Sequence, residues 1–184
     1  MFVAVVPPPK ATAELTGKLA PHRTRWPGTR WTEAASWHLT CSFMAHVDRP
    51  RHHALLPRLA EVAAGTDRFV LGLSRVGAFP AVEIARVLWV GVEPADELAR
   101  LARRCRWAAA QAGIPVGAER FTGHLTLARF PRPTDARRPV AALADLEVAA
   151  WPVTELVLFE SLLGRGDDNR PRYLALARFA LSRP

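Results

Sequence analysis

His38-Leu39-Thr40 and His124-Leu125-Thr126 repeat one tripeptide within a chain of 184 residues, at an offset of 86 residues. The same offset aligns residues 2–6 with 88–92, and residues 69–73 with 155–159. Matches at one offset across several segments indicate an internal duplication. The sequence therefore predicts two halves with the same architecture, each carrying one histidine and one threonine of the repeated motif.

Each half is predicted to run strand, helix, strand, helix, strand, and one further strand comes after the second half. Short apolar runs bounded by Pro, Gly or polar residues indicate the strands, and apolar residues three or four apart indicate the helices. The expected strands cover residues 1–6, 37–44, 69–76, 87–92, 121–130, 153–162 and 173–181. The expected helices cover residues 11–19, 48–64, 94–111 and 140–146, with turns at 22–32, 77–85 and 164–171.

Strands that alternate with helices are typical of a sandwich of the α+β class. We expect residues 1–184 to form a single domain of two pseudo-symmetric β-sheet lobes, flanked by helices, with a central cleft between them. A chain of this length buries a sufficient core without disulfide or metal staples. Its two cysteines, Cys41 and Cys105, fit no zinc or redox pattern and are expected to be buried thiols.

The formal net charge is +8, and all but two of the 25 basic residues are arginines. Excess positive charge favours a polyanionic partner, and the guanidinium group suits phosphate. Biased codon usage is an alternative origin of the arginine excess. No run approaches the ~20 apolar residues of a membrane span, and the first apolar run is too short for a signal peptide. We therefore expect a cytoplasmic monomer without membrane contact.

Side chains alternate between the two faces of a strand, so residues i and i+2 point the same way. His38, Thr40 and Ser42 are therefore expected on one face of their strand, and residues 39, 41 and 43 on the opposite face, which packs on helices. The same argument places Thr126 beside His124. Two such polar faces, brought together across a pseudo-twofold axis, form a cleft lined by two imidazoles and two hydroxyls.

Such a cleft suits acid–base chemistry at a phosphate. Opening a five-membered cyclic phosphate needs a base that deprotonates water and an acid that protonates the departing ribose oxygen, and histidine performs either role near neutral pH. Threonine hydroxyls donate to the non-bridging oxygens. We hypothesise that His38 and His124 are catalytic and that Thr40 and Thr126 bind the phosphate, with no metal ion and no cofactor required.

Five further residues are candidates for substrate binding. Arg30 and Trp31 suit a phosphate contact and base stacking, and the alternative is a loop arginine beside a core tryptophan. Phe79 and Phe121 are candidates for base stacking, although burial in the core is the commoner role of phenylalanine. Arg129 stands five residues beyond His124, so strict alternation places it on the opposite face. A structural ion pair and a phosphate contact both remain open for it.

The paired motifs resemble the two-histidine (2H) phosphoesterase superfamily and, more narrowly, the RNA 2′,3′-cyclic phosphodiesterases, also called 2′-5′ RNA ligases. The resemblance covers nearly the whole chain. Beyond the two motifs it is carried by Met1-Phe2-Val3-Ala4-Val5, Arg30-Trp31, Gly77-Ala78-Phe79-Pro80, Arg86-Val87-Leu88-Trp89-Val90-Gly91-Val92, Leu127-Ala128-Arg129, residues 156–163 and Tyr173-Leu174. The chain departs from the family pattern at Cys41-Ser42, where leucine usually comes after the threonine, and at Thr122-Gly123, where proline is usual.

The resemblance implies a two-lobed α+β fold with its cleft between the lobes. It also implies metal-independent hydrolysis of RNA 2′,3′-cyclic phosphate ends to 2′-phosphates and, as in some members, reversible joining of tRNA halves through a 2′-5′ bond. The implied partners are RNA with cyclic phosphate ends, or cyclic nucleotides. His124 carries over as the base and His38 as the acid, with Thr40 and Thr126 as the phosphate binders.

Two alternatives to RNA-end hydrolysis remain open. One is an enzyme of the same superfamily that acts on a small cyclic phosphate or on a 2′-5′-linked oligonucleotide. The other is a non-catalytic module that binds RNA ends and leaves the cyclic phosphate intact.

Overall fold

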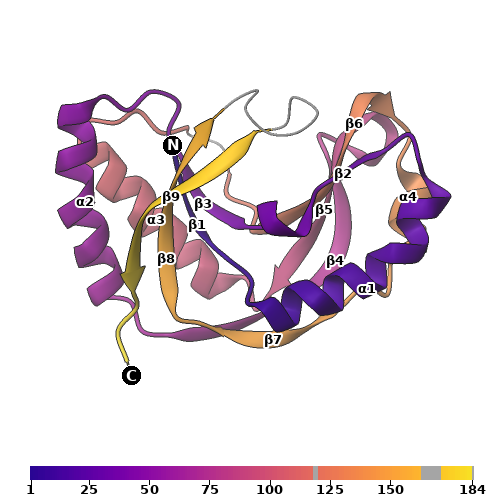
Figure 1. Cartoon of the computed structure of the whole chain (residues 1–184), viewed down its shortest axis with the longest axis horizontal. Helices are drawn as coiled ribbons and strands as arrows, with labels where there is room; N and C mark the ends of the chain where they lie inside the picture. Colours follow the sequence, from indigo (N-terminus) through magenta and orange to yellow (C-terminus); the bar gives the residue numbers. More distant parts are fainter. Residues whose placement is uncertain (118–119, 163–170, 184) are drawn as a thin grey trace.

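The computed structural model describes residues 1–117, 120–162 and 171–183. Within them, nine strands form one curled antiparallel sheet in the order β7-β4-β5-β6-β3-β1-β8-β9, and β2 pairs with β6. Helices flank this sheet on both sides of Figure 1, with α2 and α3 on the left and α1 and α4 on the right. The expected α+β class, with helices flanking a β-sheet, is confirmed. The turn expected at residues 164–171 lies, apart from residue 171, outside the described residues.

Most of the elements expected from the sequence are present, and the strands β2 and β7 are additional. The strands are β1 (Phe2–Val5), β2 (Arg30–Trp31), β3 (Leu39–Phe43), β4 (Phe69–Phe79), β5 (Ala85–Glu93), β6 (His124–Thr134), β7 (Val148–Val153), β8 (Glu155–Leu162) and β9 (Arg172–Ala180). The helices are α1 (Pro9–Arg25), α2 (Arg49–Ala64), α3 (Asp96–Gln111) and α4 (Arg137–Ala142), with short 3₁₀ turns η1 (Ala34–Ser36) and η2 (Val82–Ile84). No described helix is both long enough and apolar enough to cross a membrane.

Each helix is positioned by one apolar face. In α3 the residues at three- and four-residue spacing on one side are completely or almost completely buried, namely Leu98, Leu101, Ala102, Cys105, Ala108 and Ala109. Gly113, at φ 72°, comes after the helix in the left-handed conformation that glycine adopts without a Cβ clash. At the start of α2 the Asp48 side chain accepts a hydrogen bond from the Arg51 amide at 2.9 Å, which caps the helix. The apolar face of α3 therefore packs against β3, while α2 packs against α3 and β9.

The strands that carry the two motifs pair with their neighbours in matching registers. Across β1 and β3 the paired residues are Phe2–Phe43, Val3–Ser42, Ala4–Thr40 and Val5–Leu39. Across β5 and β6 they are Val87–Arg129, Leu88–Ala128, Trp89–Thr126 and Val90–Leu125. Each ladder contains one extra residue at the same step, Cys41 in β3 and Leu127 in β6, so each motif strand carries a β-bulge just beyond its threonine.

These registers change the expected alignment of the two halves. The motif strands keep their offset of 86 residues, but Phe2 corresponds to Val87 and not to Leu88. In the third strand Phe159 lies opposite Phe2 and Phe79 lies opposite Val87, so Phe79 is the counterpart of Phe159. The alignment read off the sequence matched Phe159 with Leu73 instead, six residues before Phe79. Apolar strands resemble one another, so residue similarity alone does not determine their register.

Each half of the sheet combines strands from both halves of the sequence. β4 joins β5 and β6, whereas β8 joins β1 and β3. The connection from β4 to β5 is short, and short connections favour antiparallel pairing of consecutive strands. The motif strands β3 and β6 meet at the centre of the sheet, where Leu39 lies opposite Leu125. One continuous sheet thus runs through both lobes, and each lobe takes its third strand from the other half of the sequence.

Several boundaries differ from the expected ones. β4 continues to Phe79, where a turn was expected from Gly77, because the indole of Trp89 lies against Gly77 and occupies the place of a side chain. β7 was not expected, since Pro152 weakens its strand pattern; it pairs with β4 at the edge of the sheet, where proline is tolerated. α1 extends past Pro21, α4 begins earlier than expected, and β6 begins only at its histidine.

Candidate active site

The central pairing of β3 with β6 brings the two motifs together. Leu39 and Leu125 are fully buried and lie opposite one another. Because the strands are antiparallel, the adjacent positions place His38 across from Thr126 and Thr40 across from His124, on the other face of the sheet. The four predicted side chains therefore form one group, in which each imidazole faces the threonine of the other motif.

The two imidazoles are held in the same way by the backbone. His38 Nδ1 lies 2.7 Å from the carbonyl oxygen of Ser36, and His124 Nδ1 lies 2.7 Å from that of Thr122. A carbonyl oxygen only accepts hydrogen bonds, so Nδ1 is the donor in both rings. The proton on Nδ1 leaves the lone pair of each neutral ring on Nε2. Both histidines are therefore set up to exchange protons through Nε2.

Burial and positive charge lower the pKa of both histidines. Desolvation is the main cause for His38, opposed by its hydrogen bond to Ser36 and reinforced by the charges of His124 and Arg129. Desolvation also dominates for His124, again opposed by a backbone hydrogen bond and reinforced by Arg129. The electrostatic coupling of the two rings, and of Arg129 to both, supports the placement of all three groups in one site.

The β-bulges decide which residues beyond the threonines face this site. Ser42 was expected on the face of His38, but it is buried at 3% exposure, whereas Phe43 was expected on the core face and is 61% exposed. The bulge at Cys41 shifts the alternation by one residue. The matching bulge in β6 returns Arg129 to the side of His124. Strict alternation therefore gave the wrong face for Ser42, Phe43 and Arg129.

Aromatic rings pack against both imidazoles. His38 lies 4.6 Å from the ring of Phe2 and meets the ring of Tyr173 edge-on at 5.2 Å. His124 meets Phe79 edge-on at 5.0 Å, and Trp89 lies 6.2 Å away. Phe79, predicted from the sequence as a substrate-binding residue, is thus in contact with a catalytic candidate. These contacts account for the burial of the imidazoles and restrict their orientation.

One pocket, of about 730 Å³, is lined in part by Ser36 and Tyr173, which both contact His38, and it has a cationic wall. Its lining includes Arg30, Trp31, Arg129 and Tyr173, and we call it the arginine pocket. Arg30 and Arg129 are exposed and lie directly opposite one another across β2 and β6. Like charges at opposed positions destabilise a sheet, and within the described residues neither arginine forms an ion pair with a carboxylate. This arrangement suits an anionic ligand. Trp31 is only 8% exposed, so most of its ring packs in the core.

A second pocket, of about 370 Å³, lies beside His124. Thr40, Phe43, Phe121 and His124 contribute to its wall, and we call it the phenylalanine groove. Arg106 and Arg120 also line it. Phe121, a sequence-predicted residue, is therefore next to both motifs. Phe43 was missed as a site residue; the available signal was its position five residues after His38, which matches Arg129 five residues after His124.

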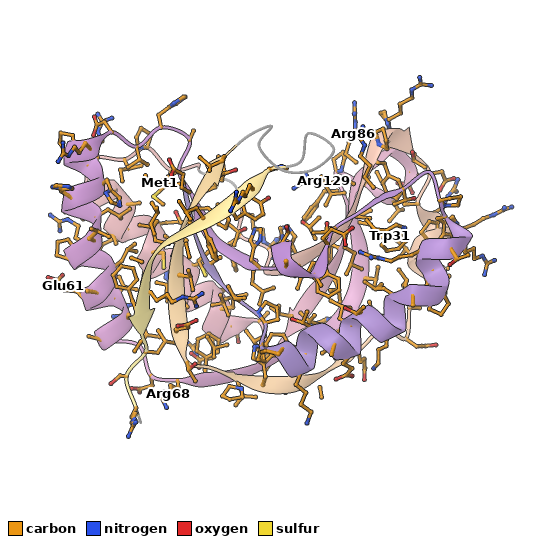
Figure 2. All side chains as sticks on the ribbon, in the orientation of Figure 1. Met1, Trp31, Glu61, Arg68, Arg86 and Arg129 are labelled. Carbon is orange, nitrogen blue, oxygen red and sulfur yellow. The ribbon has the colours of Figure 1, made fainter. Side chains whose placement is uncertain are left out.

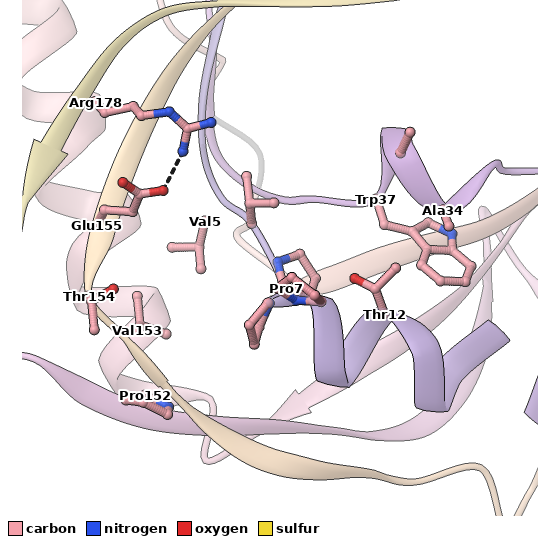
Figure 3. Close-up of a pocket in the computed structure, with 14 residues that line it drawn as sticks. Val5, Pro7, Thr12, Ala34, Trp37, Pro152, Val153, Thr154, Glu155 and Arg178 are labelled. Carbon is pink, nitrogen blue, oxygen red and sulfur yellow. Dashed lines mark hydrogen bonds and ion pairs between the residues drawn. The ribbon is translucent and has the colours of Figure 1, made fainter. Parts of the chain in front are cut away.

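Figure 2 shows Trp31 and Arg129 together on the same side of the molecule. A further pocket lies where β1 runs into α1 (Figure 3), with the Glu155–Arg178 ion pair at one side. None of the predicted site residues lines that pocket. Among the residues that the structure describes, no three His, Cys, Asp or Glu side chains are grouped so that they could hold a metal ion.

Comparison with known proteins supports this picture of the fold. Residues 8–165 match the family model of the 2′-5′ RNA ligase superfamily, so the chain belongs to that family. The chain is 31% identical over 137 residues to an RNA 2′,3′-cyclic phosphodiesterase of Aeropyrum pernix, covering 72% of this chain and 77% of the relative. It is 28% identical over 157 residues to a protein of the same name from Geobacillus stearothermophilus, covering 84% of this chain. The chain spans about half the length of the Geobacillus and Aquifex aeolicus relatives, 48% and 55%.

Solved structures with the same fold extend over the whole chain. A protein of Thermus thermophilus superposes with a TM-score of 0.79 at 25% identity, covering 99% of this chain and 97% of the other. LigT of E. coli, in a structure complexed with 3′-AMP, superposes with a TM-score of 0.77 at 27% identity and the same coverage.

Proposed function

We propose that this protein hydrolyses RNA 2′,3′-cyclic phosphate ends to 2′-phosphates by acid–base catalysis between His38 and His124. The observation that carries the proposal is the group of two imidazoles and two threonines across β3 and β6, with matching backbone hydrogen bonds at both Nδ1 atoms. The names of the curated relatives support the reaction, and the 3′-AMP bound to E. coli LigT supports a nucleotide ligand.

In the proposed reaction the cyclic phosphate lies between the two Nε2 atoms. Nε2 of His124 takes a proton from water as the water oxygen bonds to phosphorus. The bond from phosphorus to the ribose 3′ oxygen breaks, and protonated His38 donates its Nε2 proton to that oxygen. The 2′-phosphate remains on the ribose. Assignment of base and acid in this direction rests on the family resemblance, and the near-equivalent settings of the rings suit either role.

The remaining site residues stabilise and position the phosphate in this proposal. Thr40 and Thr126 donate hydrogen bonds to the non-bridging oxygens, and Arg129 balances the negative charge that develops there. Arg30 lies opposite Arg129 in the arginine pocket and adds positive charge toward the cyclic phosphate, with Trp31 beside it. Phe121 stacks with a base in the phenylalanine groove. Phe79, in contact with His124, acts on the substrate mainly by orienting that imidazole.

The same geometry supports reversible 2′-5′ joining of RNA ends, including tRNA halves, because a ribose 5′-hydroxyl can take the place of the attacking water. Every group invoked comes from one chain, which favours a monomer. The cytoplasmic location expected from the sequence stays a prediction. Hydrolysis is the primary proposal, since water is present at far higher concentration than an RNA 5′-hydroxyl.

The test is incubation with 2′,3′-cyclic AMP in EDTA, with the products separated by ion-exchange chromatography against 2′-AMP and 3′-AMP standards. The proposal predicts 2′-AMP. Formation of 3′-AMP would contradict the proposal, because it requires the bond from phosphorus to the 2′ oxygen to break. Tight binding of cyclic-ended RNA without turnover would identify a binding module. A strong preference for a small cyclic phosphate or a 2′-5′-linked oligonucleotide over cyclic-ended RNA would favour the alternative enzyme.

A further inference from the structure

Trp107 on α3 is far more exposed than its size would lead one to expect. Its exposed fraction is 61%, although the opposite face of the same helix is among the most deeply buried surfaces of the molecule. Within the described residues Trp107 makes no ring contact and no hydrogen bond. A single exposed aromatic residue is common on protein surfaces, so only its neighbours can give Trp107 a role.

Arginines surround Trp107, and two of them are committed to the fold. Arg104 donates to the carbonyl oxygen of Gly65 at 2.5 Å and to the Thr66 hydroxyl at 2.7 Å, which ties α3 to the end of α2. Arg106 donates to the carbonyl oxygen of Gly117, in the segment that leads to β6. These two side chains therefore hold the surroundings of α3 in place.

Two other arginines share the exposed stripe of Trp107. Residues 100, 103 and 107 succeed one another at intervals of three and four, so Arg100, Arg103 and Trp107 lie on one face of α3. Arg100 pairs with Glu97 near the start of the helix. Arg103 forms neither an ion pair nor a hydrogen bond within the described part of the chain. We call this stripe the Trp107 face.

The Trp107 face adjoins the proposed active site. Arg106, the residue before Trp107, lines the phenylalanine groove together with Thr40 and His124. α3 also packs against β3, the strand that carries Thr40. In Figure 1, α3 lies beside α2 on the side of the sheet formed by β3, β1, β8 and β9. A chain that leaves the groove past Arg106 thus meets Trp107 and Arg103 next.

The chemistry of the Trp107 face selects its occupant. An aromatic ring offers a stacking surface to any base, and an adjacent unpaired guanidinium binds phosphate. The net charge of +8 opposes self-association through a cationic surface and favours a polyanion. We propose that the Trp107 face binds the single-stranded RNA that precedes the cyclic phosphate end, with a base stacked on Trp107 and a phosphate at Arg103. This inference rests on the proposed function and extends the substrate to an oligonucleotide.

The experiment compares a short and a long substrate for each variant. The wild type, Trp107→Ala, Trp107→Phe and Arg103→Ala are assayed on 2′,3′-cyclic AMP and on a 12-nucleotide single-stranded RNA with a 2′,3′-cyclic end. Arg138→Ala is the control, because it removes an exposed arginine from α4 on the opposite side of the sheet. We expect all variants to hydrolyse the mononucleotide at the wild-type rate, since Trp107 and Arg103 lie outside the catalytic group.

On the oligonucleotide, Trp107→Ala should raise KM roughly tenfold, the scale of one lost base stack. Trp107→Phe should keep KM close to the wild-type value, because phenylalanine still offers a ring for stacking. Arg103→Ala should raise KM and reduce the slope of log affinity against log salt by about 0.7, the value for one phosphate contact on a single strand. Arg138→Ala should do neither.

Two results would overturn the inference. One is an effect of Trp107→Ala no larger than that of Arg138→Ala on the oligonucleotide. The other is a change in oligomeric mass on Trp107→Ala, measured by sedimentation, which would assign the face to a second copy of the chain. Lack of turnover of the mononucleotide by the wild type would instead refute the proposed catalytic function, so the two failures are distinguishable.

Discussion

The motif strands β3 and β6 occupy matching positions but differ in the residues beyond their threonines. In both motifs the histidine Nδ1 donates a hydrogen bond to the carbonyl oxygen two residues earlier, and both strands have a β-bulge one residue after the threonine. Beyond the bulge, β3 presents Phe43 and β6 presents Arg129 at equivalent positions. A symmetric pair of imidazoles is thus flanked by an apolar ring on one side and a cation on the other.

This difference gives the site a direction. A cyclic nucleotide has a flat, apolar base on one side of its ribose and an anionic phosphate on the other. The arginine pocket contains Arg30 and Arg129, whereas Phe43 and Phe121 give the phenylalanine groove a stacking surface that Arg106 and Arg120 border. Symmetric backbone geometry therefore holds the reacting groups, and the asymmetric residues decide how the substrate is oriented between them.

Loss of either imidazole should have the largest effect. His38→Ala and His124→Ala should each lower kcat on 2′,3′-cyclic AMP at least ~10²-fold, the usual contribution of one general acid or base. Both variants should retain the circular dichroism spectrum of the wild type, because neither histidine belongs to the buried hydrophobic core. Near-normal turnover by either variant would contradict a mechanism that uses both rings.

The residues beyond the bulges should separate binding from catalysis. Arg129→Ala should lower kcat at least about 10-fold, since it removes charge that stabilises the transition state. Phe43→Ala should raise KM about 5-fold with little change in kcat, because a stacked base is bound equally in the ground and transition states. Steady-state kinetics on 2′,3′-cyclic AMP measure both. Equal effects of the two substitutions on kcat would contradict the proposal that Phe43 and Arg129 orient the substrate in different ways.

Much of the site could be predicted from the sequence because short-range geometry determines it. The repeated His-x-Thr spacing identified four side chains that the structure gathers at one pairing, and the i, i+2 rule holds from His38 to Thr40. The rule failed at Ser42, Phe43 and Arg129, because a bulge leaves no mark in a single sequence. The exchange of β4 and β8 between the halves of the sheet was missed for a similar reason. It depends on which strands pair, and local apolar pattern does not encode partners.

A second asymmetry lies beneath the imidazoles and offers a stability test. Ala4 and Trp89 occupy equivalent positions in β1 and β5, and their neighbours are Val157 and Gly77 respectively. A large ring beside glycine in one ladder thus replaces a small residue beside valine in the other. A Cβ on Gly77 would clash with three atoms of the Trp89 ring. The pair Gly77–Trp89 supports Phe79, whose ring lies 5.1 Å from that of Trp89.

Gly77→Ala should therefore lower the free energy of unfolding by about 1–3 kcal/mol, the usual cost of overpacking, and lower kcat several-fold by displacing Phe79 from His124. Urea denaturation and steady-state assays measure these effects. Gly17→Ala is the matched control, because nothing lies within 4 Å of its Cβ position on α1, and a helical alanine should raise stability by up to about 1 kcal/mol. If Gly77→Ala changed neither the free energy of unfolding nor kcat, the Trp89 ring would have to shift without cost, and the proposed support of Phe79 would be wrong.

The smallest expected effect concerns pH. The base must be neutral and the acid protonated, so kcat/KM rises with pH through the pKa of the base and falls through the pKa of the acid. Burial and Arg129 lower the pKa of both histidines, which places the maximum below the ordinary histidine value of about 6.5. Arg129→Ala removes a positive charge that disfavours both imidazolium ions, so both limbs should move to higher pH. Phe43→Ala should leave the profile in place, because it changes no charge. A profile that stays fixed in Arg129→Ala would mean that Arg129 acts on the substrate alone, and the two sides of the cleft would then differ in shape but not in their influence on the histidines.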